Sequence, residues 1–376
     1  MIYILEMFGE PITYGGQESV VYNMLSTLNL KNDFKVDLFT PYFADNMNLI
    51  NLVNDNYGKV YALGLDFRIN DNRFRLYRYI DSFFKTHATY DIVHIHTGSL
   101  TTMLVYAMIA KKYKIKEVIV HSHTTGRVIS FFTRLRKFIL CKFLKRYVDI
   151  YIGCSIDSLK FKFTKDIVKK SIVVNNGIDI NRFDYNAEYR DEIKNKYSIN
   201  DKFVIGSLGR LSFEKNHEFM IDIIHKVLMV DNDVVLLIVG NGDMYDRIYN
   251  KCKDLNISEH VVFTGAQTES FKYYSAFDCF VMPSIYEGMP VTAIEAQISE
   301  LPVFLSDRIT NDCVISNATR LLSIDCADIW KEAILNIKNS DYENERNKYK
   351  IEYDKFDRKK TYCIIKDIYM RNYEKN

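Results

Sequence analysis

The chain has 376 residues, of which 48% are hydrophobic and 26% are charged, and this length favours two domains over one core. With 50 basic and 48 acidic residues the formal net charge is +2, so composition gives no support for a nucleic-acid partner. The seven cysteines are scattered and form no CxxC pair, which argues against a disulfide framework or a zinc site and favours a reducing cytoplasm.

The first ten residues, MIYILEMFGE, form an apolar run that lacks a basic start and is interrupted by Glu6. We therefore expect a first β-strand and not a signal peptide. The longest apolar runs, 103–110 and 234–240, are far shorter than the roughly 20 residues that span a bilayer. The protein is expected to be soluble or to lie on a membrane surface.

Short apolar runs alternate with amphipathic stretches along the chain. Strands are predicted at 2–7, 35–40, 59–63, 91–95, 117–121, 149–153 and 171–174, and then at 203–208, 234–239, 260–264, 278–282, 302–305 and 320–322. Helices are predicted at 17–30, 99–113, 127–147, 216–230, 243–255, 269–276 and 291–300. This alternation is typical of βαβ units with parallel sheets, and continuous apolar strands indicate helices on both sheet faces.

The fold class predicted is α/β, with two doubly wound domains. The polar segment 176–200 separates the two series of strands, which places an N-terminal domain at 1–176 and a C-terminal domain at 177–356. The charged last helix, about 357–376, either ends the second domain or packs back on the first. Ligands of open parallel sheets bind beyond the carboxyl ends of the strands, so functional residues are expected just after strands.

The most informative segment is PSIYEGMPVTAIEAQ. Pro290 suits the first position of a helix, and Gly288 lets the backbone approach a ligand closely. Amides at this helix start, with the positive end of the helix dipole, would bind an anion. Glu287 precedes the helix, and Glu295 projects from a mostly apolar face, where sugar hydroxyls would satisfy its carboxylate. The alternative is an ordinary strand-loop-helix with one capping glutamate.

Two glycine-containing loops hold further candidates. Arg210 and Lys215 follow the strand at 203–208, where two cations are placed for phosphate oxygens; otherwise they are solvated surface charges. In TYGGQESVVYNML, Gly15 and Gly16 precede a helix, either to put bare amides against phosphate or sugar, or as a plain helix-entry turn. The dinucleotide fingerprint GxGxxG is absent from this segment.

Histidines follow two strands, in HIHTGS and HSHTT. We expect His94 and His96 to face opposite sides of the sheet, and likewise His121 and His123. Their spacing defines no set of three or four metal ligands, so acid–base chemistry or phosphate binding near neutral pH is the simpler interpretation.

Two other segments allow contrasting interpretations. Asp231, Asn232 and Asp233 match the Asp-x-Asp pattern of metal-dependent sugar transferases, but they precede a strand, so a turn is predicted. The segment 127–147 is basic and rich in Phe and Leu. It either lies on anionic lipid or forms a crossover helix that packs on the sheet with a solvated basic face.

Taken in order, the motifs resemble the retaining family-4 glycosyltransferases of the GT-B class. The resemblance covers nearly the whole chain, from GGQESVVYNML through HIHTGS, HSHTT, GCSIDS, VVNNGIDINRF, GRLSFEKN, LLIVGNGDM and FTGAQ to EGMPVTAIEAQ. The spacing of Glu287 and Glu295, with GRL and EKN upstream, is specific to that family. HIHTGS and HSHTT look most like the members that build capsular polysaccharides and exopolysaccharides.

The resemblance implies two Rossmann-like domains facing a cleft and a UDP-sugar bound mainly by the C-terminal domain, without a metal ion. It implies that Arg210 and Lys215 hold the diphosphate and that Glu295 binds the ribose hydroxyls. Glu287 and His123 would be catalytic. The remaining implied residues are Gly16, Gly240, Gly242, Gly288, Met289 and Pro290 for the donor, and His121 and His96 on the acceptor side.

The implied function is transfer of a sugar from a UDP-sugar, with retained configuration, to a glycan or polyprenyl-diphosphate-linked acceptor in surface polysaccharide biosynthesis. Such a protein is expected in the cytoplasm, with a peripheral contact to the inner membrane face through 127–147 as one option and no nucleic-acid partner. Two alternatives are a GT-B sugar-nucleotide epimerase and a non-catalytic scaffold of a polysaccharide assembly complex.

Overall fold

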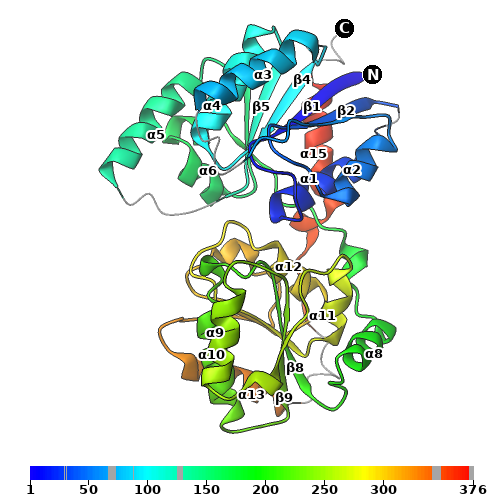
Figure 1. The fold of residues 1–376 in the computed structure, drawn as a ribbon, viewed down its shortest axis with the longest axis vertical. Helices are drawn as coiled ribbons and strands as arrows, with labels where there is room; N and C mark the ends of the chain where they lie inside the picture. The colour runs from blue at the N-terminus through cyan, green and yellow to red at the C-terminus, as the bar shows by residue number, and fades with distance from the viewer. Residues whose placement is uncertain are drawn as a thin grey trace. The chain divides into compact units, whose positions relative to one another are not determined.

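A computed structural model describes residues 1–28, 30, 32–66, 73–87, 89–124, 130–340 and 349–371. The chain divides into two compact units, Met1–Ile178 with Lys355–Asn376 (unit 1) and Asp179–Asp354 (unit 2). Each unit has one parallel sheet with helices on both of its faces (Figure 1). The prediction of an α/β chain with two doubly wound, Rossmann-like sheets is confirmed.

Unit 1 contains a seven-stranded sheet in the order β3-β2-β1-β4-β5-β6-β7. Its strands are β1 (Ile2–Phe8), β2 (Phe34–Thr40), β3 (Val60–Ala62), β4 (Ile92–His96), β5 (Glu117–Ser122), β6 (Ile150–Gly153) and β7 (Ile172–Val173). The strand order reverses at β1, which pairs with both β2 and β4. The register sets Phe8 beside His96, so the loops after β1 and β4 are neighbours at the point where such sheets bind ligands.

Each face of this sheet has its own core, because successive residues of a strand point to opposite sides. Leu5, Met7, Val93 and Ile95 face one core, which the helices α3 (Arg73–His87), α4 (Leu100–Lys112), α5 (Phe131–Leu144), α6 (Ile156–Lys162) and α7 (Lys165–Val168) complete. The other core packs against α1 (Gly16–Thr27), α2 (Met47–Asn54) and α15 (Arg358–Met370).

The last helix, α15, packs on unit 1 (Figure 1). Its Tyr362, Ile365 and Tyr369 are buried in the same core as Ile4 of β1. The Tyr362 hydroxyl also accepts a hydrogen bond from the backbone N–H of Gly177, at 2.9 Å. Of the two places expected for the C-terminal helix, the structure has the return to the first sheet.

Unit 2 contains a six-stranded sheet in the order β10-β9-β8-β11-β12-β13. Its strands are β8 (Phe203–Leu208), β9 (Val234–Val239), β10 (Val261–Phe263), β11 (Cys279–Met282), β12 (Val303–Ser306) and β13 (Thr319–Leu322). One face carries α9 (His217–Leu228), α10 (Tyr245–Asp254) and α13 (Ala327–Lys338), and the other carries α8 (Ala187–Lys196), α11 (Tyr273–Ala276) and α12 (Val291–Ile298) (Figure 1). Here the strand order reverses at β8.

Candidate functional site

In unit 2 the loops after β8 and β11 are joined at the reversal point of the sheet. The Asn216 side chain donates to the Pro283 carbonyl at 3.1 Å, and the Ile285 N–H donates to the Glu214 carbonyl at 2.8 Å. Asn216 has the left-handed backbone conformation (φ 55°), which turns the loop into α9. Two motifs that lie about 70 residues apart in sequence therefore form one surface, as expected for neighbouring parallel strands.

Lys215 and Glu287 form an ion pair across these two loops. Lys215 Nζ lies 2.7 Å from Glu287 Oε1, and the side chains are 18% and 14% exposed. Ser284 Oγ donates to the same oxygen at 2.8 Å. Arg210, in contrast, is exposed and makes no ion pair with any residue that the structure describes. The site thus combines one cation held in place with a second that is unengaged.

Three glycines set the backbone of the adjoining loops. Gly209 and Gly240 have positive φ angles of 155° and 147°, which favour glycine. A Cβ atom at Gly240 would lie 1.9 Å from the carbonyl oxygen of Gly209, and one at Gly242 would lie 2.2 Å from that of Leu211. Gly240 and Gly242, predicted as donor-binding, are thus required by the close packing of two loops.

Glu295 lies on α12 and is partly exposed. The buried Tyr274 of α11 donates its hydroxyl proton to Glu295 Oε2 at 2.7 Å. Burial raises the pKa of Glu295 to about 7, although the Tyr274 hydrogen bond and the charge of Arg182 act in the opposite direction. A protein side chain therefore supplies one of the hydrogen bonds that the sequence led us to expect from a sugar.

The start of α12 differs by one residue from the prediction. Pro290 is the N-cap, and Val291 is the first helical residue. The Pro290 carbonyl accepts from the N–H of Ala293 at 3.0 Å, so this proline closes the first turn from outside the helix. Gly288 and Met289 lie in the loop between the Lys215–Glu287 pair and this helix start, and Met289 is buried.

In unit 1 the glycine pair of the first loop lies at the start of α1. Gly15 is the N-cap and Gly16 is the first helical residue. A Cβ atom at Gly16 would meet no atom within 4 Å, so the fold itself does not require glycine at this position. In the loop after β1, the half-buried Glu10 accepts hydrogen bonds from Thr97 Oγ1 at 2.9 Å and the Gly98 N–H at 3.0 Å.

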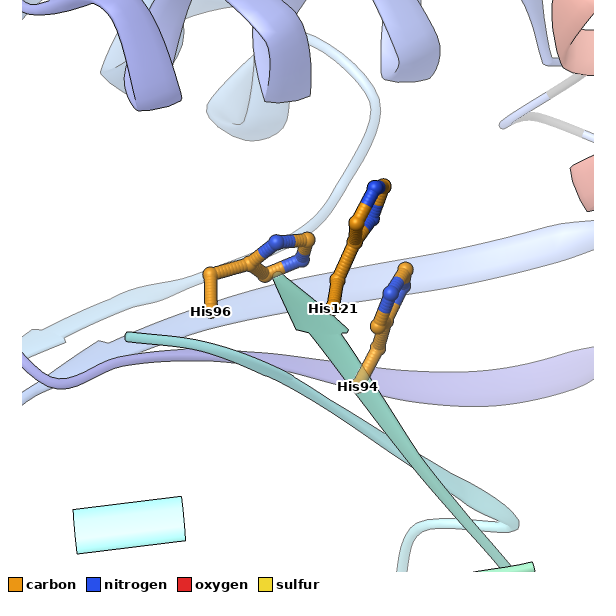
Figure 2. A group of neighbouring side chains, drawn as sticks. All are labelled: His94, His96 and His121. Carbon is orange, nitrogen blue, oxygen red and sulfur yellow. The ribbon is translucent and has the colours of Figure 1, made fainter. Parts of the chain in front are cut away.

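The prediction that the histidines of each pair face opposite sides of the sheet is wrong. Residues two apart on a strand share a face, and the ring centroids are 4.2 Å apart for His94 and His96 and 4.1 Å apart for His121 and His123. Figure 2 shows His94, His96 and His121 on the same side of the strands that carry them. The pairing of β4 with β5 joins both pairs into one cluster, which their spacing in sequence did not indicate.

Burial decides which of these histidines can meet a substrate. His96 and His121 are 0% and 1% exposed, which counts against the expected direct contact with an acceptor, whereas His123 is partly exposed. Burial lowers the pKa of His96 to about 4 and lowers the pKa values of His121 and His123 well below the ordinary value. These three rings are therefore neutral near pH 7.

Two buried residues that the sequence did not single out complete the cluster. The carboxylate of Glu6 accepts from His96 Nε2 at 2.7 Å and from the Tyr369 hydroxyl at 2.8 Å. Burial alone would raise the pKa of Glu6, but the interactions with His94 and His96, including their hydrogen bonds, lower it below its ordinary value. The sequence does contain a signal for Glu6, since it is a carboxylate within the apolar first strand. Tyr369 lies too far from Glu6 along the chain for the sequence to link the two.

One prediction from a short segment is confirmed. Asp231, Asn232 and Asp233 form the turn before β9, in which Asp231 Oδ1 accepts from the Asp233 N–H at 2.8 Å. Within the described part of the chain, no helix has the length and apolar content to cross a bilayer.

Two parallel sheets of Rossmann type, each with joined loops at its reversal point, define the GT-B class of protein. Models of two families match the chain: "Glycosyltransferase Family 4" over residues 14–182 and "Glycosyl transferases group 1" over residues 189–355. The solved structure of HepE from Anabaena with UDP-glucose has the same fold, with a TM-score of 0.74, 15% identity and 100% of both chains covered.

Curated relatives agree with these matches. EpsF of Bacillus subtilis (strain 168) is 29% identical over 66% of each chain. The Escherichia coli UDP-Gal:alpha-D-GlcNAc-diphosphoundecaprenol alpha-1,3-galactosyltransferase is 29% identical over 64% of each chain. The matched segments thus span somewhat less than two thirds of these relatives. The chain belongs to family 4 of the glycosyltransferases.

Proposed function

We propose that this protein transfers a sugar from a UDP-sugar, with retained configuration, to a glycan or polyprenyl-diphosphate-linked acceptor in surface polysaccharide synthesis. The observation that carries the proposal is the Lys215–Glu287 pair at the reversal point of unit 2, beside the start of α12. A cation held at the carboxyl end of a strand suits the diphosphate of the donor, and the adjacent carboxylate suits its sugar hydroxyls.

Each donor group has a candidate partner in unit 2. Lys215 and the exposed Arg210 would bind the diphosphate oxygens, and the amides near Gly288 and Met289 would meet the donor sugar with Glu287. Glu295, oriented by Tyr274, would accept from the ribose hydroxyls. Two cations and the positive end of a helix dipole would stabilise the departing UDP, so no metal ion is needed in this site.

Retention constrains how the acceptor reaches the sugar. The acceptor hydroxyl would attack the anomeric carbon from the face that UDP leaves, and the leaving phosphate would take the hydroxyl proton. His123, the partly exposed member of the histidine cluster, and Gly16, at the bare start of α1, would contribute from unit 1. Double displacement would instead require a carboxylate nucleophile, for which Glu287 is the candidate.

The relatives support this choice of substrates. The E. coli protein is named for a UDP-galactose donor and a diphosphoundecaprenol-linked acceptor, and HepE has been solved with UDP-glucose. UDP-galactose and UDP-glucose are sugar nucleotides of the same class. A screen of UDP-sugars for protection of this chain against thermal unfolding would identify its donor, since a ligand that binds only the native state raises the melting temperature.

Two variants test the site. Lys215→Ala and Glu295→Ala should each lower turnover by orders of magnitude while circular dichroism shows an intact fold. Lys226→Ala is a matched control, because Lys226 forms an ion pair with Asp328 at 2.9 Å, away from the site. Near-normal turnover in both site variants would refute the assignment.

Two further measurements distinguish the proposed transferase from the two alternatives, a sugar-nucleotide epimerase and a non-catalytic scaffold. Turnover of a UDP-sugar to another UDP-sugar without an acceptor would favour the epimerase. Absence of UDP binding by calorimetry would favour the non-catalytic scaffold. Transfer of label from the UDP-sugar to an added lipid-linked acceptor is the outcome that the proposal requires.

We also propose a cytoplasmic location with a peripheral membrane contact through α5. Only Cys141 and Leu144 of this helix are buried. Phe131, Phe132 and Phe138 are 73%, 79% and 60% exposed, beside basic residues of the same helix. An apolar surface with cations around it fits an anionic lipid surface, where a polyprenyl-linked acceptor would lie.

A further inference from the structure

The buried histidines of unit 1 have a hydrogen-bond arrangement that fixes where their protons lie. The side chains of Glu6, His94 and His96 are fully buried, as is Tyr369. The Tyr369 hydroxyl has one proton, and it donates that proton to Glu6 Oε1 at 2.8 Å. His94 Nδ1, 2.6 Å from the same hydroxyl oxygen, must therefore be the donor in that contact. A neutral His94 then carries a lone pair on Nε2.

The same reasoning extends along the cluster from the other carboxylate oxygen. Glu6 Oε2 can only accept, so His96 Nε2 donates to it at 2.7 Å, and His96 Nδ1 carries the lone pair. That lone pair accepts from His123 Nε2 at 2.8 Å. His123 Nδ1 is then a lone pair as well. Glu6 thus orients the rings so that their unprotonated nitrogens point away from it.

Several of these nitrogens are buried and have no partner. They are His94 Nε2, His123 Nδ1 and both ring nitrogens of His121. A buried polar atom without a hydrogen bond costs free energy, so such a group points to a missing ligand. A neutral His121 has one lone pair and one N–H, so three lone pairs of the cluster have no partner. A ligand for them must supply positive charge or hydrogen-bond donors.

We propose that His94, His96 and His121 form a binding site for a divalent transition-metal ion such as Zn²⁺. One nitrogen from each ring lies within 4.8 Å of the others, and Figure 2 shows the three rings. His96 Nδ1 would exchange its hydrogen bond from His123 for the ion, because His96 Nε2 donates to Glu6. Neutral imidazole is a preferred ligand of such ions, and three histidines with one open position make an established coordination set. Nitrogens bind zinc at about 2 Å, so the three rings would close in slightly on the ion.

The partners outside the three ligands are those that metal-binding histidines use. A ligating histidine normally donates its other N–H to a carboxylate or another oxygen, which fixes the ring. His96 donates to Glu6, and His94 donates to Tyr369. A sugar hydroxyl could also donate to the free nitrogens, but the rings of His94, His96 and His121 are 0–1% exposed, which leaves no access for a hexose.

All residues of this site lie in unit 1, whereas the Lys215–Glu287 pair lies in unit 2. Its ligands come from β4 and β5, and its outer partners come from β1 and α15. A bound ion would join four elements that are distant in sequence. The expected effect is stabilisation of unit 1, and transfer chemistry does not have to pass through the metal.

Cobalt(II) titration of the full chain, stripped of metal with a chelator, tests the proposal directly. One equivalent should bind with visible d–d absorption typical of nitrogen ligands, Zn²⁺ should displace it, and Zn²⁺ should raise the thermal unfolding midpoint. His121→Gln should abolish the signal. His121 makes no hydrogen bond in the cluster, so this variant leaves the Glu6 network intact.

Two further variants keep the test decisive. His217→Gln is the control, because His217 is also a buried histidine but lies in unit 2, and it should bind cobalt like the unchanged chain. Glu6→Gln keeps all three ligands and should weaken binding about 10- to 100-fold without changing the stoichiometry. Failure to bind one equivalent of cobalt, or an unchanged spectrum in a folded His121→Gln variant, would overturn the proposal.

Discussion

Gly16 and Gly240 both lie in loops proposed to bind the donor, but the packing of the fold requires glycine only at Gly240. A Cβ atom at Gly16 would enter open space, whereas one at Gly240 would lie 1.9 Å from the Gly209 carbonyl oxygen. Sequence reasoning assigned both to donor binding, because a glycine required by packing and one required by a ligand look the same in a sequence. The atoms around each position separate the two cases.

This contrast gives a paired prediction. Gly240→Ala should lower the free energy of unfolding by more than about 2 kcal/mol, since backbone must move to admit the methyl group. Gly16→Ala should change it by less than about 1 kcal/mol, because alanine is well tolerated in a helix, yet it should weaken UDP-sugar binding. Urea denaturation and calorimetry measure the two effects. A stable Gly240→Ala variant, or full UDP-sugar affinity in Gly16→Ala, would contradict this account.

Glu295 gives a pH-dependent prediction. Its pKa is about 7 in the folded protein against an ordinary value of 4.5, so the native state binds the extra proton between these pH values. The unfolding free energy therefore falls as pH rises through this range. Glu295→Gln removes the titration and keeps an acceptor for Tyr274. At about pH 8 it should be more stable than the unchanged chain by about 1 kcal/mol, allowing for partial exposure, with no difference near pH 4.

The measurement is urea denaturation of both proteins at the two pH values. If the two proteins differed equally in unfolding free energy at both pH values, burial of Glu295 would not perturb its ionisation. The same variant should lose affinity for UDP, since an amide cannot replace a carboxylate toward two ribose hydroxyls. Stability and binding would then change in opposite directions, which a merely structural role would not produce.

At the scale of whole elements, the strands were the most predictable part of the chain. Every predicted strand is present with ends within one residue of the prediction, because buried parallel strands are short, continuous apolar runs. Several helices were missed, among them α3, α8 and α13. The helix α8, within the segment interpreted as a break, buries only Ile193 and Lys194 and begins at the capping residue Asn186. Such a helix has too little apolar periodicity to be recognised.

The helix α5 was predicted, but its surroundings were not. The sequence left open a crossover helix packed on the sheet, and the structure buries only two of its residues. The predicted helix began at residue 127, and its residues 127–129 lie outside the described part of the chain. Amphipathic spacing alone cannot tell which apolar face a helix buries, so the exposed phenylalanines became evident only from the packing.

This exposure leads to a prediction for α5. Replacing Phe131, Phe132 and Phe138 together by serine should reduce binding to vesicles containing anionic lipid at least tenfold, because burial of each side chain contributes about 2 kcal/mol at most. Thermal stability should hardly change, since all three are exposed. Vesicle sedimentation measures the binding. Unchanged binding, or equal binding of the unchanged chain to neutral vesicles, would refute the membrane contact.

At the scale of the whole molecule, the chain leaves unit 1 after Ile178 and returns to it at Lys355. The sequence indicated two doubly wound sheets and the order of their motifs. It did not decide where the last helix packs, because an amphipathic helix fits either sheet equally well by pattern. Residue contacts of Tyr362 and Tyr369 with unit 1 make that choice in the structure.

A truncated chain ending at Asp354 tests this division. Loss of α15 exposes the core around Ile4 and removes Tyr369 from Glu6, so unit 1 should be destabilised and unit 2 should not. Hydrogen exchange should show rapid exchange in β1 and β4 with normal protection in β8 and β9. Equal loss of protection in both units would contradict the assignment of α15 to unit 1.

The position of α15 has a consequence for synthesis of the protein. Folding during translation proceeds as segments leave the ribosome, and domains generally fold as units. Unit 2 is contained within the interval between two parts of unit 1, so its entire sequence emerges before α15 does. The nascent chain would therefore hold a finished second lobe while the first still has an uncovered apolar face. That interval is when the growing polypeptide is most exposed to aggregation and most in need of chaperones.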